Sequence, residues 1–255
     1  MKITFLGAVE QVTGSKYLIE QENTKVLVDC GLFQGGYKTT QRNWDEFPID
    51  PASINAVVLT HAHIDHSGYV PLLVKKGFKG KIYCTQGTYE LCQILLIDNG
   101  HIQEEAAKRT NQYKDPNDPI RAPLYTQPDA ENSFRFFQVM DYDTAFKIGS
   151  LSVTLIRCSH ITGSAFVVVS DGKNKLTFSG DLGGPNQLIM QAPTPLQQTD
   201  YLVLESTYGN RIHEEGDPIK QLGELINTTV ARGGSVLIPA FALCSVFATF
   251  SAWRC

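Results

Sequence analysis

Four potential metal ligands lie within six residues of this chain, in the segment HAHIDH at residues 61–66. Histidines two positions apart in an extended segment project to the same side, so His61 and His63 can reach one metal ion. Asp65 and His66 stand at the expected turn into a helix, where they can reach a second ion. A polar loop that caps a helix, with Asp65 as the N-cap, is the alternative interpretation. Because three of the six histidines gather here, the segment favours a metal site.

The residues that flank this segment predict a strand before it and a helix after it. Residues 56–60 (AVVLT) are apolar on both faces, as in a strand inside a covered sheet. A short helix is predicted over residues 69–76, with Pro71 in its first turn and Gly77 as the stop signal. This order of strand, polar loop and helix is typical of an α/β protein.

Further strands and one long helix follow from the pattern of apolar residues. Apolar residues at helical spacing predict a helix over residues 87–109, and a stretch rich in Pro and Asp, residues 113–128, is expected to break regular structure. Short runs of β-type residues predict strands at residues 2–6, 16–20, 25–28, 151–156, 165–169, 175–178 and 201–204.

Composition excludes several classes of protein. With 255 residues, of which 42% are hydrophobic, the chain is neither a disordered tail, a collagen-like repeat nor a coiled coil. The formal net charge of −4 lacks the basic excess of a non-specific nucleic-acid binder, so a polyanionic substrate must be attracted locally. Six scattered cysteines without a CxxC pair indicate reduced thiols and a cytoplasmic location. The first residues, MKITFLGAVE, support neither a signal peptide nor a membrane anchor.

Two distant segments offer further ligands of the same kind. His160 lies in the segment CSH, shortly after the predicted strand 151–156, and Asp181 lies in SGD, directly after the predicted strand 175–178. Taken alone, each residue is an ordinary loop or turn residue. Together with the HAHIDH segment, each becomes a candidate metal ligand.

The combination of HxHxDH, a distant histidine and a distant aspartate resembles the signature of the metallo-β-lactamase superfamily. Asp29, in the segment LVDCG, stands at the first motif of that family. The segment ESTYGNR, residues 205–211, is similar to the motif that opens the β-CASP branch of nucleic-acid hydrolases. Within that branch, the segments at 123–126 and 163–165 resemble the RNA-processing members. The resemblance extends over residues 2–242.

The resemblance implies a centre with two zinc ions. The first ion is expected on three imidazoles, those of His61, His63 and His160. The second is expected on Asp65 and His66, with Asp181 bridging the pair. Two zinc ions about 3.5 to 4 Å apart can lower the pKa of a water molecule between them and brace a phosphate during in-line attack. Their added charge of +4 would offset the net charge of −4 of the chain.

Three carboxylates are the expected catalytic residues, namely Asp29, Asp65 and Glu205. A carboxylate beside a metal-binding histidine commonly accepts the other imidazole N–H and fixes its tautomer, and we expect this role for Asp29 and Glu205. Two other interpretations stay open. Asp29 could initiate a turn with Gly31, and Glu205 could be a solvated strand end.

The resemblance also predicts the domain organisation. An αββα sandwich of two mixed sheets flanked by helices, of the α/β (α+β) class, is expected over residues 1–211, and the beginning of a β-CASP domain over residues 212–255. Complete β-CASP enzymes are longer and carry further histidines, whereas none follows His213 here, and residues 243–250 depart from the family pattern. We therefore expect a truncated or frame-shifted member that lacks closing elements, with a weak second zinc site and impaired activity.

The expected function is zinc-dependent hydrolysis of RNA phosphodiester bonds, by internal or terminal cleavage. A thioester or lactam hydrolase would use the same metal ligands without needing the motif at 205–211. A non-catalytic RNA-binding or assembly subunit is a third interpretation. RNA is the expected partner and no membrane association is expected, while a homodimer stays open.

Overall fold

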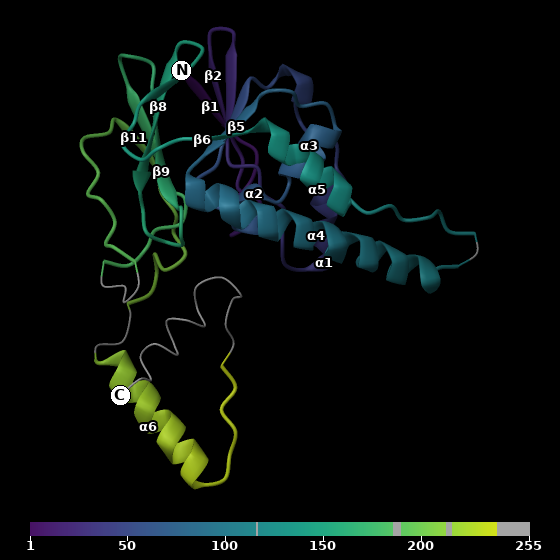
Figure 1. Cartoon of the computed structure of the whole chain (residues 1–255), viewed down its shortest axis with the longest axis vertical. Coiled ribbons are helices and arrows are strands. Elements are labelled where there is room, and N and C mark those ends of the chain that lie inside the picture. Colours follow the sequence, from purple (N-terminus) through teal and green to yellow (C-terminus); the bar gives the residue numbers. More distant parts are fainter. Residues whose placement is uncertain (116, 186–189, 213–215, 239–255) are drawn as a thin grey trace.

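The computed structural model describes residues 1–115, 117–185, 190–212 and 216–238, and within these ranges two β-sheets pack face to face (Figure 1). Helices α3, α4 and α5 pack beside the sheet that carries the N-terminal strands. This arrangement confirms the expected α/β sandwich of two mixed sheets with flanking helices.

Sheet A contains six strands in the order β1-β2-β3-β4-β5-β6. Strand β2 is antiparallel to both of its neighbours, β1 and β3, whereas β3, β4, β5 and β6 run parallel. The strands are β1 (Lys2–Phe5), β2 (Tyr17–Gln21), β3 (Thr24–Val28), β4 (Ala56–Val58), β5 (Lys81–Cys84) and β6 (Phe137–Val139).

Sheet B contains five strands in the order β11-β10-β9-β8-β7. Among its described strands only the pair β10 and β11 is parallel, and the other neighbours are antiparallel. The strands are β7 (Phe146–Ile148), β8 (Leu151–Arg157), β9 (Ala165–Ser170), β10 (Lys175–Phe178) and β11 (Tyr201–Val203).

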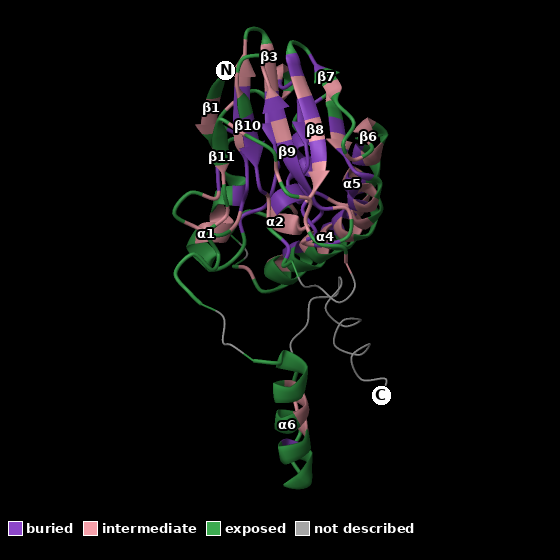
Figure 2. Ribbon diagram, turned by 90° about the vertical axis from the view of Figure 1, so that its left-hand side faces the viewer, coloured by how far each residue is buried: buried purple, intermediate pink, exposed green. Residues whose placement is uncertain are grey.

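Alternation along the strands divides the core into two layers. Val26 and Val28 of β3 pack between the sheets, with Val153 and Val167 of sheet B, whereas Leu27 belongs to the layer between sheet A and the helices. Successive side chains of a strand point to opposite faces, so β3 contributes to both layers. Figure 2 shows buried residues along the central strands of sheet B, β8, β9 and β10.

Six α-helices and three short 3₁₀ helices complete the described chain. The α-helices are α1 (Tyr37–Gln41), α2 (Ile64–Ser67), α3 (Val70–Lys75), α4 (Gln86–Gln112), α5 (Gln127–Ser133) and α6 (Pro218–Ala231). The 3₁₀ helices span Arg42–Trp44, Pro51–Ser53 and Phe134–Phe136. Among the helices of the described ranges, none has both the length and the apolar character needed to cross a membrane.

The sequence predicted eight of the eleven described strands and the helices α3 and α4, but it did not predict β5, β6, β7, α1 or α5. Residues 113–128 were expected to break regular structure, yet α5 begins at Gln127, and Pro128 lies in its first turn. Proline is tolerated there because its missing N–H would have no helical partner. The Thr126 side chain accepts a hydrogen bond from the Asp129 N–H, and the Asp129 carboxylate accepts one from the Thr126 N–H. This capping box starts the helix against the expectation from composition.

The segment expected to open a β-CASP domain contains α6, which stands apart from the two sheets in Figures 1 and 2. Asp217 caps this helix by accepting hydrogen bonds from the N–H groups of Ile219 and Lys220. The family departure expected at residues 243–250 lies outside the described residues.

Candidate metal centre

Sheet A places half of the site at the ends of β3 and β4. These strands are parallel neighbours, so Asp29 and the segment 60–66 leave the sheet at the same edge. The turn into α2 packs closely on the segment after Asp29, where the Cys30 N–H donates to His66 O at 2.7 Å. A Cβ at Gly31 would overlap the carbonyl oxygen of Asp65, so this close approach requires glycine.

Sheet B supplies the other half from two loops. His160 follows β8, and its N–H donates to Ser164 Oγ at 2.8 Å. Asp181 follows β10 in a turn where Gly180 has a φ of +52°. The Ala165 N–H at the start of β9 donates to Thr60 O at 2.8 Å, which ties the two sheets together beside the site.

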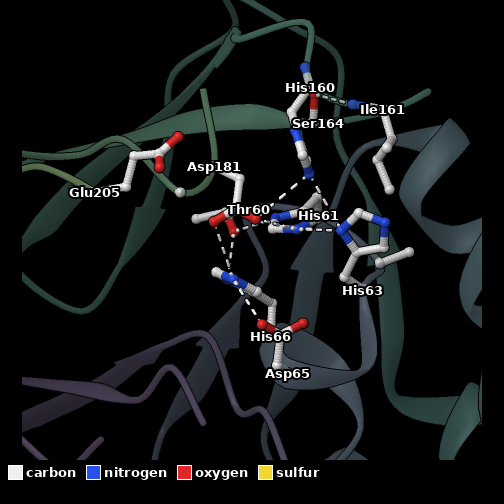
Figure 3. Close-up of polar contacts among 12 residues, drawn as sticks. Thr60, His61, His63, Asp65, His66, His160, Ile161, Ser164, Asp181 and Glu205 are labelled. Atoms are coloured by element: carbon white, nitrogen blue, oxygen red, sulfur yellow. Dashed lines mark hydrogen bonds and ion pairs between the residues drawn. The ribbon is translucent and has the colours of Figure 1, made fainter. Parts of the chain in front are cut away.

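Four side chains converge on one point, as Figure 3 shows. His63 Nδ1 lies 3.1 Å from His61 Nε2 and 3.2 Å from His160 Nε2. Asp181 Oδ2 lies 3.7 Å from His61 Nε2 and 3.4 Å from His160 Nε2. Ligand atoms on a tetrahedral zinc ion lie about 3.3 Å apart. These spacings therefore fit a single divalent ion.

A second group of ligand atoms lies on the other side of Asp181. His66 Nε2 is 3.2 Å from Asp181 Oδ1 and 3.8 Å from Asp65 Oδ2. The two carboxylate oxygens of Asp181 therefore face different sets of side chains (Figure 3). The N-cap of α2 is His63, and Asp65 lies in the first turn of the helix rather than at its cap.

Asp29 lies behind the histidines and is fully buried. Its Oδ2 accepts a hydrogen bond from His66 Nδ1 at 2.8 Å, and its Oδ1 accepts one from the Thr60 N–H at 2.7 Å. The carboxylate thus contacts the imidazole nitrogen that points away from Asp181. Thr60 also contacts this carboxylate and was missed by the sequence analysis, although its place directly before HAHIDH was a usable signal.

Glu205 is arranged differently from Asp29. Its Oε1 accepts from the Leu182 N–H at 2.7 Å, and its Oε2 accepts from the Thr207 N–H at 3.3 Å. Its own N–H donates to Ser179 Oγ at 3.0 Å. The structure therefore pairs this half-buried carboxylate with backbone next to Asp181, where the sequence analysis expected an imidazole partner.

Comparison with known proteins identifies the family. The family model described as the metallo-beta-lactamase superfamily matches residues 10–208. The chain belongs to this superfamily. It is 34% identical over 244 residues to ribonuclease TTHA0252 of Thermus thermophilus, covering 95% of the chain and 52% of that protein.

Two further relatives of this member of the superfamily are a transcription termination factor and an endoribonuclease by name. Transcription termination factor FttA of Methanothermobacter thermautotrophicus is 32% identical, covering 95% of the chain and 37% of the relative. Endoribonuclease YSH1 of Eremothecium gossypii is 27% identical, covering 93% and 30%. The chain thus spans about half the length of the first relative and less of the other two.

Burial favours the neutral form of the three histidines in the first ligand set. It lowers the pKa of His61 well below its usual value, and the neighbouring imidazoles act in the same direction. Burial also lowers the pKa of His63 to about 4 and lowers that of His160. Metal ions bind neutral imidazole. The three histidines of the first set are therefore held in the form that a divalent cation binds.

At His66 and Asp181 neighbouring charges oppose the effect of burial on the pKa. Burial disfavours the charged form of His66, but the carboxylates of Asp29 and Asp181 outweigh it and raise the pKa of this imidazole. Burial raises the pKa of Asp65. Burial also disfavours the charged form of Asp181, yet the neighbouring histidines lower its pKa. Three imidazoles with a shared carboxylate fit a divalent metal, and this donor set in this fold implies one.

A cavity of about 400 Å³ opens beside the second ligand set. Residues of the segments 8–12 and 203–207 line it together with Asp65, His66 and Asp181. Five carboxylates and no lysine or arginine lie among the described residues that line it. An anionic substrate would meet negative charge here unless cations were bound.

Proposed function

We propose that this chain is a hydrolase that cleaves RNA phosphodiester bonds with two zinc ions. The observation that supports it best is the placement of Asp181, which presents one carboxylate oxygen to each of two ligand sets. The relatives are a ribonuclease, an endoribonuclease and a termination factor by name, and the motif at 205–211 belongs to the same expectation. A fold shared with many other hydrolases would not by itself select RNA.

The two ligand sets would hold the two ions unequally. In the first set His61, His63 and His160 provide three imidazole nitrogens, joined by Asp181. In the second, Asp65 and His66 share Asp181, which gives three side chains among the described residues rather than four. We therefore propose a tight first zinc and a weaker second zinc. Zinc pairs of this kind lower the pKa of a water molecule and stabilise charge on a phosphoryl group.

Residues beyond the ligands orient the site. Asp29 accepts a hydrogen bond from the Nδ1–H of His66. This contact orients the imidazole ring so that its Nε2 points towards Asp181 and Asp65. Glu205 holds the N–H of Leu182 and so fixes the backbone that follows Asp181. Both are positioning residues in this proposal. Asp65 lines the cavity and would be a ligand of the second ion.

The charge of the cavity supports a metal-dependent reaction on an anion. Carboxylates alone would repel a phosphodiester, whereas two divalent ions would reverse the local charge. A thioester or lactam substrate carries less charge and would need this reversal less.

The test is cleavage of a labelled RNA by the purified chain. Because the second zinc site is expected to be weak, we expect slow cleavage with added zinc, loss of cleavage with a chelator, and loss in His63→Ala. His101→Ala is the matched control, because His101 is exposed on α4. Hydrolysis of a thioester without cleavage of RNA would favour the alternative hydrolase. RNA retention without turnover, unchanged in His63→Ala, would point to a non-catalytic subunit.

Two further proposals concern the context of the site. We place the start of a second domain at residue 212, supported by the separation of α6 from the sheets in Figure 2. We place the chain in the cytoplasm, supported by the free and buried thiols of Cys30, Cys84, Cys92 and Cys158.

A further inference from the structure

The buried hydroxyl of Thr60 contacts side chains behind both sets of metal ligands. Thr60 is 1% exposed, and its Oγ1 lies 2.8 Å from Asp29 Oδ2 and 3.0 Å from His61 Nδ1. It also lies 3.5 Å from His66 Nδ1, at the limit of a hydrogen bond. The expected ligands and carboxylates do not include this residue, and it faces the site from behind the imidazoles.

The donors and acceptors around the Thr60 hydroxyl determine which atoms of Thr60 and His61 carry a proton. A hydroxyl has one proton to donate, and an ionised carboxylate can only accept. Thr60 therefore donates to Asp29 Oδ2 and accepts from His61 Nδ1–H. Since a neutral imidazole carries one N–H, His61 Nε2 is unprotonated. That atom faces His63 Nδ1 and Asp181 Oδ2.

The same contacts reach the second set through Asp29. The oxygen that accepts the Thr60 hydroxyl, Asp29 Oδ2, also accepts from His66 Nδ1 at 2.8 Å. The hydroxyl thus touches the first set directly and the second set through one shared carboxylate oxygen. Removing it would leave His61 Nδ1 without this buried partner, which is costly for a buried polar group.

We propose that Thr60 is a positioning residue whose hydroxyl sets the tautomer of His61 and the orientation of Asp29, and so supports zinc binding in both sets. The proposal rests on the metal centre proposed above. The main chain of Thr60 is held separately, because its N–H donates to Asp29 Oδ1 and its O accepts from the Ala165 N–H. A change that removes only the hydroxyl therefore keeps the strand end in place.

The test measures the zinc affinity of the full chain by competition with a chromophoric chelator. Thr60→Val keeps the shape and removes the hydroxyl, and we expect zinc affinity to fall about 10- to 100-fold in both sets. Thr60→Ser keeps the hydroxyl and is expected to bind within about threefold of wild type. Thr177→Val is the matched control, since Thr177 is equally buried in β10 and its hydroxyl pairs with Thr199 Oγ1 at 2.8 Å, outside both sets.

Thermal unfolding of the metal-free proteins separates a binding effect from a folding effect. If Thr60→Val does not fold, Thr60→Ala takes its place, and a loss in Thr60→Ala that Thr60→Ser does not share supports the proposal. Equal affinity in Thr60→Val and wild type, or an equal loss in Thr177→Val, would overturn it. A wild-type chain that binds no zinc would overturn both this role and the proposed function. Failure to cleave RNA with the zinc results intact would remove only the proposed substrate.

Discussion

The two halves of the metal centre are held in different ways. On sheet A, Asp29, His61 and His66 are buried and bonded to one another or to Thr60 through side chains. On sheet B, His160 and Asp181 are about one quarter to one third exposed. The main-chain N–H of His160 is bonded to Ser164, and the backbone after Asp181 is bonded to Glu205. We infer that side-chain identity matters most on sheet A, and loop backbone geometry matters most on sheet B.

The largest effect should come from Asp181, where the two halves meet. Asp181→Ala removes an oxygen from each ligand set, so we expect zinc content to fall from two ions to at most one and RNA cleavage to fall more than about 100-fold. Metal analysis of the purified protein and a cleavage assay measure both. Asp98→Ala, an exposed aspartate on α4, should behave as wild type. Two tightly bound ions in Asp181→Ala would remove its bridging role.

A smaller and more selective effect is expected on sheet A. Asp29→Ala takes the partner from His66 Nδ1, so affinity for the second zinc should fall about 10- to 100-fold while the first zinc is less affected. The metal-free protein should also lose about 3 kcal/mol of stability, because a buried charged partner is left alone. Chelator competition and chemical denaturation give the two numbers. An equal loss of affinity for both zinc ions would show that Asp29 does not act selectively on the second ligand set.

A weaker effect is expected for Glu205 on sheet B. Glu205→Gln keeps a carbonyl oxygen that can accept from the Leu182 N–H, so cleavage should fall less than about threefold. Glu205→Ala removes the acceptor and should lower cleavage about 3- to 10-fold, the worth of one ordinary hydrogen bond. Steady-state kinetics on the same RNA compares the two. A loss in Glu205→Gln as large as in Glu205→Ala would indicate that the charge, rather than the loop contact, is what matters.

The smallest effect on activity, and a clear one on stability, should come from Lys16. This buried ammonium lies 4.2 Å from the Phe33 ring and 5.1 Å from the Tyr69 ring, and burial lowers its pKa to about 8. In the unfolded chain this lysine keeps its proton up to about pH 10.4. Burial of the charged form therefore lowers the free energy of unfolding below pH 8. The free energy of unfolding rises as pH increases from 8 towards 10.4, because the folded lysine loses its proton first.

Lys16→Met removes this penalty. At pH 7 we expect the free energy of unfolding to rise by about 1 to 3 kcal/mol, after the loss of the cation–π contacts is subtracted. The difference between Lys16→Met and wild type should shrink between pH 8 and 10.4, because wild-type Lys16 becomes neutral in the folded state. Denaturation at a series of pH values measures this difference, and cleavage should stay near wild type. A constant difference across this pH range would contradict the assignment.

The contrast between the two halves of the metal centre also explains which site residues the sequence analysis could predict. The HAHIDH segment and Asp29 each follow a predicted apolar strand, so residue type and apolar runs were enough to identify them as candidate site residues. The structure adds that these two strands are parallel neighbours. His160 and Asp181 were predicted as metal ligands only because the HAHIDH segment had already indicated a metal site. Taken alone, each is an ordinary loop residue. Sequence patterns carry little information on which loops of two packed sheets meet.

Other features depended on contacts that no local pattern reveals. The backbone partners of Glu205 depend on how the loop after β10 lies against the end of β11. Thr60 looks like an ordinary strand residue until Asp29 and His61 are placed around its hydroxyl. Helix α5 was missed because Pro128 was taken as a breaker, when it occupies the first turn of a capped helix.

Anomalous scattering at the zinc edge, from crystals of the zinc-loaded chain, tests the metal centre most directly. The account predicts two peaks, one among His61, His63 and His160 and one between Asp65 and His66, with Asp181 contacting both. Zinc bound elsewhere, or no zinc between these side chains, would contradict it.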